Sequence, residues 1–229
     1  LSRFDSQGLD FALSGANVGC SSDSDFSFDP ATFAFTSEIR EPFECPENKF
    51  SYLTSAVIAE VTNEVTAQGI KVKLWPSVVM GTSLDLFIRT DFIGAFDYMA
   101  GTLTGPQIMR MRYSGANRNE PVTGWISGQD QQAELSVDMD LYVDAPYASE
   151  WSPINNPVNL ISYPIEMNLD GAVTFLDDGR MEVEQSNTNL INLDLELWAG
   201  TAGGTKAGYI DLFIPEYGTK INMISEPIK

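Results

Sequence analysis

The sequence predicts one mainly β domain, built as an antiparallel sandwich or curled sheet of roughly 9–12 strands. From residue 70 onward, apolar and polar residues alternate with a period of two, and clusters of Gly, Pro, Asn and Asp separate these runs. No repeat or linker divides the 229 residues, a length that suffices for one large core. We therefore expect a single domain over residues 1–229.

The first predicted strand lies near the start of the chain, where Leu9, Phe11 and Leu13 alternate with other residues before Gly15. Two interpretations fit this pattern. The segment is either an ordinary first strand or an assembly strand that completes the sheet of a neighbouring subunit, as in donor-strand pairing. The ordinary strand is the favoured interpretation, and the assembly strand stays a candidate.

Residues 20–48 contain both cysteines, Cys20 and Cys45, among serines, aspartates, prolines and phenylalanines. We expect an ordered loop region pinned by a disulfide bond between them, with Phe33 and Phe35 in a further short strand. Closing a loop of about 25 residues contributes on the order of 3 kcal/mol. A disulfide implies an oxidising compartment. The alternative is two free, buried thiols.

Residues 52–68 are predicted as the single substantial helix. Leu53, Val57, Val61 and Val65 recur every four residues, and Gly69 suits the position that follows a helix. The same residues also satisfy a period of two, and β-branched residues are frequent, which favours a strand. We take the helix as the prediction and keep the strand as the alternative.

The remaining elements are expected as strands, each bounded by turn-forming residues. The predicted strands are 70–75, 78–80, 84–93, 107–113, 122–127, 133–143, 158–176, 180–198, 208–214 and 219–224.

The clearest pattern is a long amphipathic hairpin over residues 159–198. A two-residue loop at its turn would place Phe175 opposite a glutamate, whereas a three-residue loop pairs apolar with apolar and puts Gly179 in the left-handed position. The polar stretch Gln185–Asn189 interrupts the apolar stripe and predicts a bulge or fraying. The expected pairs are Phe175 with Met181, Val173 with Val183, Ile165 with Ile191, Tyr163 with Leu193, and Ile161 with Leu195.

Such a hairpin cannot be stable alone, because its apolar face must be covered. A second sheet, a neighbouring subunit or an apolar ligand would each cover it. Strands of this length also suit a lipid-transfer tube or a membrane barrel. The membrane barrel ranks third, because the odd-numbered face is aliphatic from end to end and shows no aromatic girdles.

The composition excludes several classes of function. Formal net charge is −19, from 32 acidic and 13 basic residues, which argues against binding nucleic acid or anionic membrane surfaces. The chain has no histidine. This excludes Ser-His-Asp and Cys-His nucleophile systems and histidine-ligated zinc or haem. We expect no enzyme activity and, calcium aside, no cofactor.

Two acidic clusters are the candidates for chemistry. Asp23, Asp25 and Asp29 resemble half of a calcium loop, although the spacing of an EF-hand is not met, and a solvated acidic loop is the favoured alternative. A second cluster alternates along one predicted strand. Its carboxylates could serve a glycosidase, but alternation alone predicts a polar outer face. Its members are Glu134, Asp138, Asp140 and Asp144.

The first functional hypothesis is an exported, non-enzymatic structural protein, such as a filament, pilus or matrix subunit that associates with itself or with another exported protein through β-strands. The chain begins at Leu1 and has no apolar stretch of the ~18 residues that a membrane helix needs, so we expect an extracellular, cell-surface or periplasmic location. The alternative is a protein that binds a lipid or another apolar small ligand. Methionines in the predicted strands favour that adaptable lining, namely Met109, Met111, Met139, Met167 and Met181.

Overall fold

The computed structural model describes residues 14–24, 27–29, 31–32, 34–36, 49–83, 85–92, 96–103, 105–128, 133–145, 154–155, 161–199 and 205–227. All of its regular elements in these ranges are β-strands, and every strand pairing is antiparallel. The strands are β1 (Ser14–Ser24), β2 (Ser27–Asp29), β3 (Ala34–Thr36), β4 (Lys49–Ser55), β5 (Ile58–Thr66), β6 (Gly69–Trp75), β7 (Val78–Gly81), β8 (Asp85–Phe92), β9 (Phe96–Leu103), β10 (Gln107–Met111), β11 (Val122–Ser127), β12 (Ala133–Asp144), β13 (Ile154–Asn155), β14 (Tyr163–Phe175), β15 (Met181–Asn187), β16 (Ile191–Ala199), β17 (Thr205–Ile214) and β18 (Thr219–Ile224).

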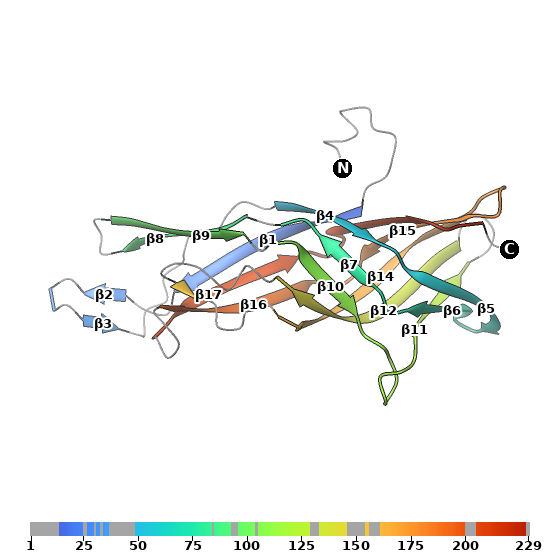
Figure 1. The fold of residues 1–229 in the computed structure, drawn as a ribbon, viewed down its shortest axis with the longest axis horizontal. Helices are drawn as coiled ribbons and strands as arrows, with labels where there is room; N and C mark the ends of the chain where they lie inside the picture. Colours follow the sequence, from blue (N-terminus) through green and yellow to red (C-terminus); the bar gives the residue numbers. More distant parts are fainter. Residues whose placement is uncertain are drawn as a thin grey trace, which may run out of the picture.

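Eight of these strands form a closed ring of hydrogen-bonded neighbours, in the order β10-β7-β4-β1-β18-β15-β14-β12, because β12 pairs with β10 again. Strands β11, β6 and β5 continue the sheet from the other half of β12, and β17, β16 and β13 continue it from the second half of β1. The hairpins β2–β3 and β8–β9 lie at the end of the molecule opposite β5 and β6 (Figure 1). The chain is a β-barrel with sheet extensions.

The prediction of a mainly β, antiparallel chain is confirmed, but the prediction of a sandwich or curled sheet is wrong. The ring closes because β12 pairs with β14 along one edge and with both β11 and β10 along the other. The predicted strand number is also too low, since 18 strands occur in the described ranges. Much of this excess comes from the first hundred residues, where we expected a loop region and a helix.

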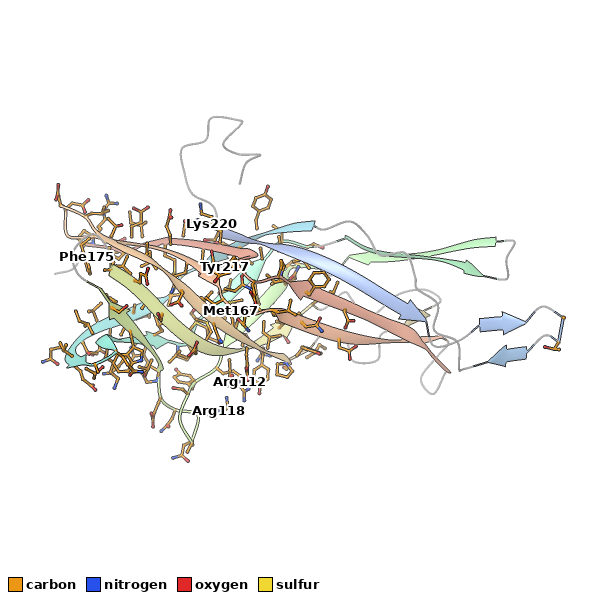
Figure 2. All side chains as sticks on the ribbon, turned by 180° about the vertical axis from the view of Figure 1, so that it is seen from behind. Arg112, Arg118, Met167, Phe175, Tyr217 and Lys220 are labelled. Atoms are coloured by element: carbon orange, nitrogen blue, oxygen red, sulfur yellow. The ribbon has the colours of Figure 1, made fainter. Side chains whose placement is uncertain are left out.

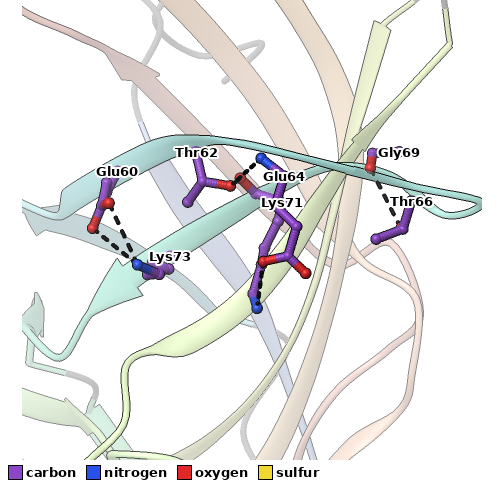
Figure 3. A network of polar contacts seen from close by, with 7 residues as sticks. All are labelled: Glu60, Thr62, Glu64, Thr66, Gly69, Lys71 and Lys73. Atoms are coloured by element: carbon purple, nitrogen blue, oxygen red, sulfur yellow. Dashed lines mark hydrogen bonds and ion pairs between the residues drawn. The ribbon is translucent and has the colours of Figure 1, made fainter.

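The expected helix at residues 52–68 is strand β4 followed by β5. The preference of β-branched residues for strands outweighs the four-residue spacing, and β5 pairs with β6. The register of this pair shifts between Val61 and Val65. At this irregularity, the Thr62 hydroxyl donates to the Lys71 carbonyl at 2.9 Å. Ion pairs across the outer face, Lys71 with Glu64 and Lys73 with Glu60, join the two strands (Figure 3).

The predicted turn of the long hairpin is confirmed. Phe175 pairs with Met181 and Val173 with Val183, and Gly179 has a φ of 82° in the three-residue loop. Backbone and side-chain hydrogen bonds from Arg180 hold the pKa of Asp178 below its ordinary value. This carboxylate therefore supports the turn above that ordinary pKa, and its support is lost as the pH falls through the lowered pKa.

The continuation of the hairpin to residue 198 is wrong. Strand β15 ends at Asn187, and the chain crosses to a different partner, because β16 pairs with β17 and β13 instead of β14. The expected pairs Ile165 with Ile191 and Tyr163 with Leu193 therefore do not form as ladder pairs. A side-chain contact links the two segments instead: the Asp194 backbone N–H donates a hydrogen bond to the Tyr163 hydroxyl at 3.0 Å.

Polar side chains hold this crossing in place. Asn187 is completely buried, and its Nδ2 donates to the carbonyls of Asn189 and Pro215 at 2.7 and 2.8 Å. Its Oδ1 accepts hydrogen bonds from the backbone N–H and the hydroxyl of Thr219 at 2.8 and 2.9 Å. The Asn189 carboxamide bonds to the backbone of β14 in the same way. The polar break in the apolar stripe is thus the point where the sheet divides.

Replacing Asn187 with Ala should destabilise the fold by about 2–4 kcal/mol, because it leaves several buried backbone and hydroxyl groups unpaired. Urea unfolding followed by circular dichroism measures the change. Asn192→Ala, at an exposed position of β16, is the control and should change stability by less than about 0.5 kcal/mol. Equal effects of the two substitutions would contradict this role of Asn187.

Candidate functional site

The barrel encloses an apolar cavity of about 60 Å³. Aliphatic and thioether side chains from six of the ring strands, from β6 and from the residue between β4 and β5 dominate its wall. It carries no charged group among the residues that line it. These residues are Ser14, Leu53, Ser55, Val57, Leu74, Val79, Met109, Met111, Leu135, Met139, Leu141, Met167, Leu169, Gln185, Ile221 and Met223.

The alternating pattern of the sequence places these side chains inside. Along β12 and β14, alternate residues are buried, and the register puts Met139 opposite Met167 and Leu141 opposite Ile165. Because both strands keep the same phase, their apolar faces form one continuous inner wall. The polar residues between them, such as Asp138 and Glu166, face outward and are exposed.

Methionines make up a large part of this wall. Of the five that the sequence suggested for an adaptable lining, Met109, Met111, Met139 and Met167 contact the cavity, whereas Met181 packs elsewhere in the core. Figure 2 shows Met167 in the middle of the strands that surround it. Met223 of β18 is a lining residue that the sequence pattern did not single out. The unbranched, flexible methionine side chains of the wall can rearrange around an apolar ligand.

The cavity is sealed on one side and accessible on another. Most of its lining residues on β12 and β14 are buried, for example Leu141 at 2% exposure and Met167 at 4%, and Met139 is half-buried. On β4 and β18, Ser55 is exposed and Met223 is half-buried. Access to the cavity therefore lies on the side formed by the β4–β5 connection and β18.

Gln185 is the carboxamide residue among those that line this apolar space. Gln185 is 4% exposed, and its Nε2 donates to the Leu135 carbonyl at 2.8 Å. Gln185 pairs with Gly171, which in turn pairs with Leu135, so the side chain reaches across β14 to β12. A Cβ at position 171 would overlap the backbone oxygen of Glu184, so only glycine fits at this crossing.

The acidic face of β12 lies on the outside of the barrel, as alternation predicted. Asp144 binds Arg110, with 2.8 Å between Oδ2 and Nε, and Asp140 lies 3.3 Å from Arg118 and 3.7 Å from Arg112. Arg112 and Arg118 project away from the cavity, on the loop side of the barrel (Figure 2). These carboxylates neutralise arginines, and the structure brings no pair of them together in the cavity.

The other predicted site residues fall in parts that are not described. Leu9, Phe11, Leu13, Asp25 and Cys45 lie outside the described residues, and only the backbone is described for Cys20 and Asp23 in β1 and for Asp29 in β2. The disulfide, the calcium loop and the assembly strand are therefore not part of the described structure. Within the described ranges, no cluster of three or more acidic or cysteine side chains could hold a metal ion. The expected loop at 20–48 nevertheless includes strand residues of β1, β2 and β3.

Comparison with known proteins gives one informative likeness. No protein-family model matches the chain, and no solved structure matches it. A curated relative, alkane uptake protein B of Marinobacter nauticus, is 34% identical over 208 residues. That alignment covers 81% of this chain but 19% of the relative, so the chain spans about a fifth of the length of the protein it matches. Across the described ranges, no helix is both long and apolar enough to cross a membrane.

This likeness corrects the first functional hypothesis. The expectation of a filament, pilus or matrix subunit is wrong, because the relative is named for uptake of an apolar substrate rather than for assembly. The likeness favours the second hypothesis, a β protein that binds an apolar ligand, and the cavity is the feature that such a ligand would require.

The outer ion pairs should contribute little to stability. Asp144→Asn keeps an oxygen acceptor for the Ser162 backbone N–H but removes the charge and one of the two oxygens that accept from Arg110, and at this exposed pair we expect a loss of at most about 1 kcal/mol. Urea unfolding at low and at high salt measures it, and the loss should shrink at high salt. A loss above about 3 kcal/mol would show that this face is a structural or functional centre instead of a solvated surface.

Proposed function

We propose that this chain is the part of an uptake protein that holds an aliphatic molecule inside its barrel, at the cell surface, where such a substrate is met. The observation that carries the proposal is the cavity, whose wall is apolar and continuous over β10, β12 and β14. The likeness to a protein named for alkane uptake supports the choice of an aliphatic guest.

The physical chemistry of the wall suits an unbranched, uncharged chain. Transfer of each methylene group from water to an apolar site contributes about 0.8 kcal/mol to the free energy of binding. The lining contains no charged residue that could stabilise an ionic ligand. The empty space of about 60 Å³ is small for a long chain, so binding requires side chains to move. Methionines with three rotatable bonds are suited to that movement, because they repack at little strain.

The accessible side between the β4–β5 connection and β18 gives the guest a route. Half-buried Val57, Ile221 and Met223 line this route, so an aliphatic chain would remain in contact with apolar side chains as it enters. The outer surface is acidic, with formal net charge −19, and would not retain a neutral chain. The inside of the barrel is therefore the place where binding energy is available.

Titration of the protein with n-hexane, n-octane and n-decane tests the proposal. With ¹³C-methyl-labelled methionine, the resonances of Met109, Met111, Met139, Met167 and Met223 should shift together, with affinity rising with chain length. Met181 lies outside the cavity wall and serves as an internal control. No shift of any lining methionine with any alkane would overturn the proposal.

Filling the cavity should abolish this binding. Met139→Trp adds a bulky ring to a half-buried lining position, and we expect the affinity for n-octane to fall by at least tenfold. Asp138→Trp, on the exposed outer face of the same strand, is the matched control and should retain binding. Melting temperatures of both variants establish that the fold is intact before affinities are compared.

A further inference from the structure

The barrel holds a second apolar cavity, of about 40 Å³, next to the one lined by Met139 and Met167. Ring strands β1, β10, β12 and β14 supply one part of its wall, and β16 and β17 supply the other. Among its lining residues, Gln107 is the polar one and none is charged. The second cavity therefore suits the same uncharged, apolar class of ligand as the first.

The two cavities follow one another along the same strands. On β12, Leu141 lines the first cavity, and Val143, two residues further on, lines the second. On β14, which runs antiparallel to β12, Met167 lines the first cavity and Ile165 the second. Residues two apart in a strand point to the same face and lie about 7 Å apart. The cavities are therefore stacked along the inside of the barrel.

Met109 of β10 stands between them. Among the described residues, it alone lines both cavities, and it is buried at 6% exposure. Its ladder partner on one side, Val79, lines the first cavity, and its partner on the other side, Val143, lines the second. A methionine side chain is unbranched and has three rotatable bonds, so it can change rotamer without moving the strand that carries it.

We propose that an aliphatic chain longer than the first cavity passes Met109 and continues into the second cavity. Met109 is then a gate between two halves of one binding site. This rests on the proposed function, because the second cavity extends the site of the same ligand. It names the ligand more closely, as a long, unbranched and uncharged hydrocarbon chain.

The shape and chemistry of the two spaces support this class of ligand. Each cavity is small, and the two meet at one side chain, so a thin unbranched chain suits them better than a ring. Each methylene group that reaches the second cavity leaves water for an apolar wall, which strengthens binding. A charged end group would gain no partner in either lining.

Isoleucine methyl groups report on the two cavities separately. Ile221 lines the first cavity, whereas Ile165, Ile191 and Ile214 line the second. In the wild-type chain with ¹³C-methyl-labelled isoleucine, n-decane should shift all four resonances together. The shorter n-hexane should shift Ile221 at concentrations that leave the other three unchanged. Ile58, exposed on β5, is the internal control and should not respond.

Filling the second cavity should weaken the binding of long chains only. Ile214→Trp adds a ring at a half-buried position that lines the second cavity and not the first. We expect the affinity for n-decane to fall at least about tenfold, because its additional methylene groups lose their apolar contacts. The affinity for n-hexane should stay that of the wild type. Asn192→Trp, at an exposed position of the neighbouring strand β16, is the matched control and should change neither affinity.

The gate itself is tested by Met109→Ile, which replaces a flexible side chain with one that is stiff at χ1. With this variant, n-decane should still shift Ile221 but should shift Ile165, Ile191 and Ile214 much less. Met111→Ile makes the same change on the same strand at a residue that lines the first cavity alone, and should leave the second set as in the wild type.

The outcomes separate the two proposals. If neither alkane binds the wild-type chain, the proposed function fails. If n-decane binds the wild-type chain but shifts Ile221 alone, the second cavity is not part of the site and the first cavity stands. If the Met109→Ile variant shows the wild-type shifts, Met109 is not a gate. The wild-type measurement does not depend on the folding of any variant.

Discussion

The pairing of β12 along both of its edges is the constraint on which the rest of the structure depends. One edge is covered by β14 along nearly its whole length, and the other is shared between β11 and β10. Because β10 also pairs with β7, the sheet returns on itself and a closed inner space results. Closure removes free edges from the ring and lets the apolar faces of its strands cover one another. The apolar face of the β14–β15 hairpin is therefore covered by the other strands of the same barrel.

Local patterns in the sequence were sufficient for the strands and for the turn at Gly179, but not for the way in which the strands join. A period of two depends on neighbouring residues, so it located β6, β7, β11 and β18 to within a residue of their observed ends. The pairing of β16 with β17 instead of β14 joins residues brought together only by the whole fold. The helix expected at 52–68 failed for a related reason, since the edge position of β5 leaves its apolar residues exposed.

The same limit applies to the candidate site. The methionines were visible in the sequence, and their strands placed Met109, Met111, Met139 and Met167 on one wall. Gln185, Asn187 and Asn189 were visible only as an interruption of an apolar stripe, which suggested local weakness. Asn187 and Asn189 instead fix the point where the sheet divides, and Gln185 is among the residues that line the cavity. A polar break in a regular pattern can therefore mark a branch point of the fold, which only the tertiary contacts reveal.

The direction of the apolar faces connects this fold to a binding role. A barrel that spans a membrane presents apolar residues outward around its circumference. On β12 and β14 the arrangement is reversed, with apolar residues inward and residues such as Asp138, Asp140 and Glu166 outward. Inward apolar faces can be used up entirely by packing against one another, as in a filled core. Here they leave an apolar cavity with one accessible side, so part of the wall is still available to interact with a guest.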